Sequence, residues 1–160
     1  MEQTVGLGSR VRDLVSGFEG IVEHLSFYAN QGTLAAVQPN TLNKDGERIA
    51  GEMFDITQLE IITLTPPFKI PEPPEQRFEF GDKVKCKFTG YAGTVTGRAI
   101  YINGCSRAYV QPPYNSAAQS KTAEGKFIAE GSLEAVEKAK PADVPTKTTR
   151  GGPSDVCSFR

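Results

Sequence analysis

The chain has little of the side-chain chemistry on which most metal sites and many enzymes depend. Its 160 residues include one histidine, His24, and three cysteines, Cys86, Cys105 and Cys157. A single histidine excludes a histidine cluster for a metal, and the widely spaced cysteines form neither a CxxC pair nor a disulfide framework. The cysteines are therefore expected to be free thiols, with Cys157 placed where it could cross-link to a partner.

Several larger patterns are also missing. No apolar run approaches the roughly 18 residues that a membrane helix needs, and the first residues do not have the form of a signal peptide. No GxSxG, HExxH, P-loop or CxxC pattern occurs, and the carboxylates are scattered among predicted turns and strand ends. We therefore expect a protein without catalytic activity, cofactor, metal or membrane partner, made and kept in a reducing cytoplasm.

Charge is divided unevenly along the chain. Residues 1–65 hold four Lys/Arg against nine Asp/Glu, whereas residues 80–137 hold seven against five and residues 138–160 hold five against two. Two interpretations stay open: ordinary solvated faces, or a bipolar molecule whose basic half meets an acidic surface of a partner or a neighbouring copy.

The most informative positive feature is an internal repeat. With a shift of 73 residues, positions 7–39 align with positions 80–112 without a gap and share eleven identities. The identities fall mainly at glycine and apolar positions: Gly8 with Gly81, Val11 with Val84, Gly17 with Gly90, Gly20 with Gly93, Val22 with Val95, Tyr28 with Tyr101, Asn30 with Asn103, Ala35 with Ala108, and "VQP" at 37–39 with "VQP" at 110–112. The chain is therefore a duplication of one module.

The repeat sets the domain boundaries. The copies occupy residues 1–65 and 80–137, and between them residues 66–79 are rich in proline, which favours a stiff, extended linker. Residues 138–160 lack apolar periodicity and are expected to form an extended tail with no core of its own.

Each copy predicts five short strands. Valine alternates with charged residues in "RVRD" and "KVKC", and longer strand-like runs follow in "GIVEHLSFY" with "TLAAVQP" and in "TVTGRAIYI" with "SRAYVQP". The copies end in "GEMFDITQLEII" and "GKFIAEGSLEAVE", each of which predicts a strand, a short turn and a last strand. "IYINGCSRAYV" predicts a hairpin with a type I′ turn at Asn-Gly. The predicted class is all-β, with two tandem small barrels.

A bracketed turn follows the first strand of each copy. Gly17 and Gly20, and their counterparts Gly90 and Gly93, are predicted to supply positive φ or close backbone approach. Between them stands an aromatic residue, Phe18 in one copy and Tyr91 in the other. Such a side chain either folds back to cap the core or stays exposed as a contact residue.

These segments resemble a known family. "LGSRVRDLVSGFEGIV" and "FGDKVKCKFTGYAGTV" resemble the opening of SH3-like barrels of the KOW type, in which a GDxV strand leads through a glycine-bracketed turn into a GxV strand. The resemblance implies two tandem SH3-like barrels joined by the Pro-rich linker. The repeated unit is also similar to small proteins of tailed bacteriophages and prophages, which implies residence in the host cytoplasm during assembly and in the virion.

The expected function is that of a non-enzymatic structural or interaction protein, a virion or assembly component of a capsid or tail that bridges neighbouring subunits. Its partners would be other virion or assembly proteins, or further copies of itself arranged head to tail. Two alternatives stay open: a KOW-like nucleic-acid-binding protein, and a phage protein that sequesters a host signalling nucleotide.

Two sets of residues are candidates for contact. Tyr91 with Lys85, Lys87, Arg98 and Arg107 forms a candidate nucleic-acid patch, in which an aromatic ring lies among basic side chains. In the tail, Val156, Cys157 and Phe159 form a candidate apolar anchor that neighbouring basic residues would steer to an acidic surface. The other interpretation of the tail is a dispensable end.

Overall fold

The structure is a computed structural model that describes residues 4–64, 66, 69–114 and 124–138. This part of the chain is all-β, as predicted, with every strand pairing antiparallel. Its ten strands and two 3-10 helices follow the predicted segments: β1 (Arg10–Asp13), β2 (Glu19–Tyr28), β3 (Leu34–Gln38), β4 (Glu52–Asp55), η1 (Ile56–Gln58), β5 (Leu59–Thr63), β6 (Lys83–Cys86), β7 (Ala92–Tyr101), β8 (Ser106–Gln111), β9 (Lys126–Ala129), η2 (Glu130–Ser132) and β10 (Leu133–Glu137).

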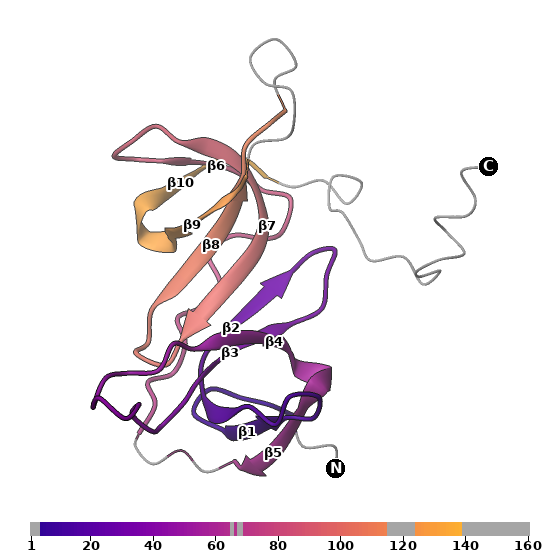
Figure 1. Cartoon of the computed structure of the whole chain (residues 1–160). Coiled ribbons are helices and arrows are strands. Elements are labelled where there is room, and N and C mark those ends of the chain that lie inside the picture. Colours follow the sequence, from indigo (N-terminus) through magenta and orange to yellow (C-terminus); the bar gives the residue numbers. More distant parts are fainter. Residues whose placement is uncertain (1–3, 65, 67–68, 115–123, 139–160) are drawn as a thin grey trace, which may run out of the picture.

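The two halves of the chain pair their strands in the same order. The first half has the order β5-β1-β2-β3-β4, and the second has β10-β6-β7-β8-β9. In both, a one-turn 3-10 helix connects the last two strands. Figure 1 shows the halves one above the other, with β2 and β7 where they meet.

Each half has a core of its own. The largest fully buried apolar side chains of the described residues are repeat-related valines, Val11, Val22 and Val37 in the first half and Val84, Val95 and Val110 in the second. They come from the inward positions of strands with alternating burial. Burial of each such side chain stabilises the fold by about 1.5 kcal/mol or more.

The bracketing glycines have two different structural roles. Gly17 and Gly90 adopt φ of +77° and +75°, and each N–H closes the turn by donating to the carbonyl four residues earlier. Gly20 and Gly93 have no such φ. A Cβ on them would collide with the carbonyls of Gln38 and Gln111 on the neighbouring strand. The first glycine of each pair therefore reverses the chain, and the second lets two strands approach closely.

The hairpin between β7 and β8 differs from the predicted type I′ turn. Gly104 has φ of +87°, but Asn103 does not have the positive φ that a type I′ turn requires, because no non-glycine residue in the described part does. The N–H of Gly104 donates to the carbonyl of Tyr101, and the N–H of Tyr101 donates to that of Cys105. The loop is thus three residues long and uses its glycine at the last position.

The halves are joined by a direct strand pairing. β1 and β6 are only four residues long, so each covers one end of the ten-residue strand beside it. The remaining ends of β2 and β7 pair with each other, over residues 24–28 and 97–101. This pairing makes one continuous ten-stranded sheet and covers two edges that would otherwise be open.

The register of this pairing has local two-fold symmetry. Its cross-strand pairs include His24 with Tyr101 and Tyr28 with Gly97. In the repeat alignment Gly97 is the counterpart of His24, and Tyr101 is the counterpart of Tyr28. A two-fold rotation therefore exchanges the two pairs, with its axis at the pair formed by Ser26 and Ala99. The junction has the self-complementary form of a homodimer interface.

The Pro-rich linker touches both halves. A Cβ on Gly8 would collide with Ile70, and one on Gly104 would lie 3.1 Å from Pro71. Phe78, which the sequence assigns to the linker, is only 7% exposed and belongs to the second core. The linker therefore packs along the molecule, and the second core begins before residue 80.

Candidate binding pocket between the two halves

A pocket of about 560 Å³ lies where the two halves meet, and we call it the junction pocket. Four of its lining residues belong to the first half and six to the second. They are Tyr28, Asn30, Gln31 and Leu34, and Thr96, Tyr109, Gln111, Glu124, Gly125 and Phe127. The volume is within the range of small-molecule sites, which are roughly 300–1,000 Å³. The pocket exists because β2 pairs with β7.

Three aromatic rings and Leu34 form its apolar part. Tyr28, Tyr109 and Phe127 form a mutual cluster, with the Tyr109 ring centroid 5.8 Å from that of Tyr28 and 5.0 Å from that of Phe127. The rings are tilted by 75° and 62°, the edge-to-face arrangement that aromatic pairs favour. Burial raises the pKa of Tyr28, so its phenol keeps its proton and remains a donor at neutral pH.

Two glycines make room for these rings. A Cβ on Gly97 would lie 2.8 Å from a ring carbon of Tyr28 and 3.1 Å from the Cβ of Tyr109. A Cβ on Gly125 would lie 2.6 Å from the Tyr109 ring. Real Cβ atoms do not approach so closely, so both positions need glycine to keep the tyrosines where they are.

Most of the other lining residues are polar and uncharged. They are the amides of Asn30, Gln31 and Gln111 and the hydroxyl of Thr96. Glu124 is the one charged residue among the described residues that line the junction pocket. Amides both donate and accept hydrogen bonds, so this lining suits a ligand that does the same.

The symmetry-related position on the other side of the axis is built differently. There His24 takes the place of Gly97, and its ring packs on Tyr101 with centroids 4.7 Å apart. The guanidinium of Arg107, the counterpart of Leu34, lies 5.4 Å from the centre of the same ring. Ala36 stands where the second half has Tyr109. On this side Tyr101 is therefore contacted by both His24 and Arg107.

The side that holds His24 also carries charge. Glu23, the counterpart of Thr96, pairs with Arg48 at 2.9 Å. Burial lowers the pKa of His24, and Arg107 adds to this effect while Glu23 opposes it. His24, which the sequence treats as a lone histidine without a role, is therefore a packing residue of the junction.

Both turn aromatics fold back. Phe18 is partly buried against the first core, 5.4 Å from Phe54. Tyr91 packs on the second core, and its hydroxyl donates to the carbonyl of Val110 at 3.4 Å. Of the two alternatives, capping is therefore the one seen in the structure.

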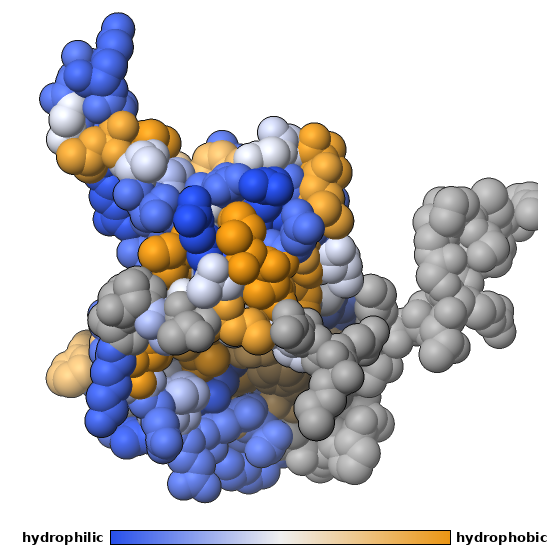
Figure 2. All heavy atoms as spheres, turned by 90° about the horizontal axis from the view of Figure 1, so that it is seen from below, coloured by the Kyte–Doolittle hydropathy of each residue, from blue (hydrophilic) through white to orange (hydrophobic). Residues whose placement is uncertain are grey.

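Two other apolar residues of these turns, and not Phe18 or Tyr91, are strongly exposed. Val15 is 81% exposed and Phe88 is 83% exposed, and the two are repeat counterparts. Each stands two residues before the turn glycine. The sequence signal for this exposed pair is that both copies have an apolar residue at the same position of the turn. Figure 2 shows apolar side chains in separate patches among hydrophilic ones.

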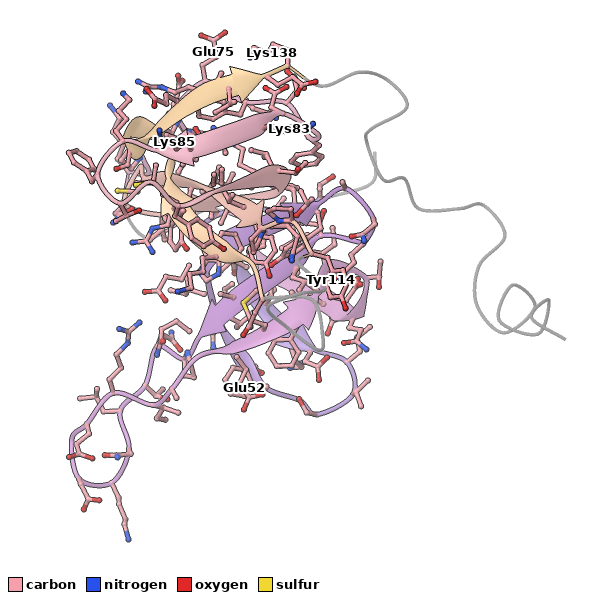
Figure 3. The ribbon with its side chains drawn as sticks, turned by 90° about the horizontal axis from the view of Figure 1, so that it is seen from above. Glu52, Glu75, Lys83, Lys85, Tyr114 and Lys138 are labelled. Atoms are coloured by element: carbon pink, nitrogen blue, oxygen red, sulfur yellow. The ribbon has the colours of Figure 1, made fainter. Side chains whose placement is uncertain are left out.

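The residues of the predicted basic patch lie in different surroundings. Arg98 is 14% exposed and pairs with the buried Glu130 at 2.8 Å, and Ser106 donates to the other oxygen of that carboxylate. Lys85 stands directly across from Glu134 on β10. Figure 3 shows Lys83 and Lys85 on one strand, and Lys83 pairs with Glu137 at 3.2 Å.

The other two basic candidates, Lys87 and Arg107, are exposed. Arg107 covers Tyr101 at the junction, apart from Lys87 in the turn. The structure therefore does not bring the predicted cationic residues together as one free patch.

The remaining candidate residues add no further site among the described residues. The tail residues Val156, Cys157 and Phe159 lie outside the described residues. Cys86 is buried, and hydrogen bonds from Thr89 lower the pKa of its thiol. In the described ranges no three His, Cys, Asp or Glu side chains are grouped as a metal site would need. Within the same ranges no helix is long and apolar enough to cross a membrane.

No protein-family model, curated protein or solved structure matches this chain. The assignment of function therefore depends on the geometry described above.

Proposed function

We propose that the chain is a non-enzymatic interaction protein, made of two SH3-like small barrels, that binds its target at the junction pocket. Three observations support the two-barrel architecture. Each half has its own core, the two share one strand order, and a 3-10 helix precedes the last strand in both.

One observation carries the proposal: the junction pocket is lined by residues of both halves, and the symmetry-related position has different residues, with His24 and Arg107 packed on Tyr101. If these residues served only to pack the two halves together, the same side chains could stand on both sides of the axis. Gly97 instead leaves Tyr28 and Tyr109 accessible to a pocket, where His24 covers Tyr101 on the other side. Concave aromatic sites with a few convergent polar groups are where proteins most often bind ligands.

The chemistry of the lining favours binding over catalysis. Amide groups do not titrate near neutral pH, and tyrosine and threonine hydroxyls keep their protons there. General acid–base catalysis needs a group that exchanges a proton at the working pH, usually paired with a second one. Glu124 has no such titratable partner among the described lining residues.

The setting of the proposal comes from the resemblance to phage proteins. We place the chain in a virion, or in its assembly in the host cytoplasm, bridging neighbouring subunits of a capsid or tail. The targets would be other assembly proteins or further copies of the chain. The nucleic-acid alternative is not favoured, because the candidate basic residues do not lie together: Arg98 pairs with Glu130, and Arg107 covers Tyr101 at the junction.

Affinity purification with matched variants tests this function. The tagged full chain is recovered from phage-producing cells as wild type, Tyr28→Ala and Tyr101→Ala, and co-purifying components are quantified by mass spectrometry. Tyr28→Ala should lose a defined set of components that Tyr101→Ala retains, and the chain should be found in purified particles. Equal recovery with all three proteins would refute the role of the pocket.

A further inference from the structure

We propose that the junction pocket binds a neutral saccharide, a hexose or a short oligosaccharide of hexoses. This inference rests on the proposed function, because it names the ligand class of the same pocket. It follows from the charge, the hydrogen-bonding groups and the ring arrangement of the lining.

Charge argues against a phosphorylated ligand. Proteins pair phosphate groups with arginine, lysine or the N–H groups of a helix N-terminus. Among the described lining residues of the junction pocket there is no arginine or lysine, and the one charged group is the carboxylate of Glu124. A nucleotide or a nucleic-acid backbone would meet repulsion there, whereas a neutral ligand would not.

The polar groups match hydroxyls. A sugar hydroxyl donates one hydrogen bond and accepts others, so it is best satisfied by groups that also do both. The amides of Asn30 and Gln31 and the hydroxyl of Thr96 have this property, and the Glu124 carboxylate accepts from one or two hydroxyls. Several such groups around one pocket can hold adjacent hydroxyls of a single ring.

The rings favour a saccharide over a flat base. A nucleobase gains most when aromatic faces lie parallel to it, by stacking. Here Tyr28, Tyr109 and Phe127 are tilted by 62–75° to one another, so no two of them form a parallel slot. A puckered sugar ring needs only one aromatic face for its C–H side, and it presents its hydroxyls to the polar groups around it.

The side of the junction that holds His24 provides an internal control. Tyr101 is the symmetry mate of Tyr28, and Met53 stands on β4 across from Ala36 as Phe127 stands on β9 across from Tyr109. Substitutions at Tyr101 and Met53 remove side chains of similar size from equivalent positions. They leave the junction pocket itself untouched.

The experiment uses the full chain and ligand-observed NMR. The neutral probes are glucose, galactose, N-acetylglucosamine and β-linked disaccharides of each, and adenosine and AMP are added at the same concentrations. At least one neutral saccharide should show saturation transfer and perturb tyrosine fluorescence. Tyr28→Ala or Phe127→Ala should weaken its binding by about tenfold or more, whereas Tyr101→Ala and Met53→Ala should change it less than twofold.

Gln31→Ala distinguishes a loss of binding from a loss of folding, because Gln31 is exposed. Its removal should weaken binding while the amide spectrum stays unchanged. No binding of any saccharide at 20 mM (about the weakest affinity of interest), or stronger binding of AMP than of every neutral probe, would overturn the inference. Either result leaves the proposed function standing if Tyr28→Ala still loses co-purifying components. If no variant alters co-purification, the proposed function fails separately.

Discussion

Replacing each turn glycine by alanine should reveal two different energetic roles. At Gly90 the added Cβ meets no atom within 4 Å, so the only penalty is the positive φ. For an L-residue this conformation costs about 1–2 kcal/mol. The exposed Lys87 in the same turn is the control, and Lys87→Ala should change stability by less than about 0.5 kcal/mol.

At Gly93 the penalty has another origin. The added Cβ would collide with the carbonyl of Gln111 on β8, which is backbone and cannot turn aside. Overpacking of this kind costs about 1–3 kcal/mol, and a strand hydrogen bond lost as the sheet opens adds about 1 kcal/mol. Gly93→Ala should therefore destabilise the protein by about 2–4 kcal/mol, more than Gly90→Ala.

Urea unfolding followed by circular dichroism measures these differences, with an unchanged slope showing that only stability has changed. For a chain of this size about 1 kcal/mol corresponds to about 4 °C in Tm, which gives a second readout. A Gly93→Ala midpoint equal to that of Lys87→Ala, or higher than that of Gly90→Ala, would refute the close-approach argument.

Three further predictions address the junction and the charges. Residues 1–64 expressed alone should fold and form a homodimer through the free end of β2, and a monomer in analytical ultracentrifugation would contradict the self-complementary pairing. Because burial lowers the pKa of His24, its contribution to stability is present above about pH 6.5 and is lost as the pH falls below that value. The midpoint of urea unfolding should therefore fall less between pH 7.5 and pH 5 in His24→Gln than in the wild type, and an equal fall in both proteins would exclude the effect. Arg98→Met leaves a buried carboxylate unpaired and should destabilise by about 3 kcal/mol, whereas Lys83→Met should cost less than about 1 kcal/mol, as chemical denaturation would show.

The architecture within each half could be predicted because its signals are local. Alternating valines, paired glycines and turn residues recur at the same spacing in both copies, and the strands lie where that spacing indicates. The type I′ turn at Asn103 was wrong because the same dipeptide also suits a three-residue loop, in which only the glycine needs positive φ.

The junction pocket could not be predicted, because it depends on a pairing between strands about 73 positions apart in sequence. The repeat alignment does show Gly97 opposite His24 and Tyr109 opposite Ala36. Those differences indicate a pocket only once the strand register is known to place Gly97 across from Tyr28. Arg98 was assigned to a surface patch for a similar reason, since nothing near it in sequence reveals Glu130 as its partner.

The fusion of the two copies has a consequence for stoichiometry. In a homodimer of one module every substitution would appear on both sides of the axis, so the two sides would have the same residues. With the copies in one chain, Gly97 and His24 can differ, and the molecule offers one junction pocket per chain. A titration should therefore saturate at one ligand per chain, and an assembly of many chains would gain multivalency only through its own symmetry.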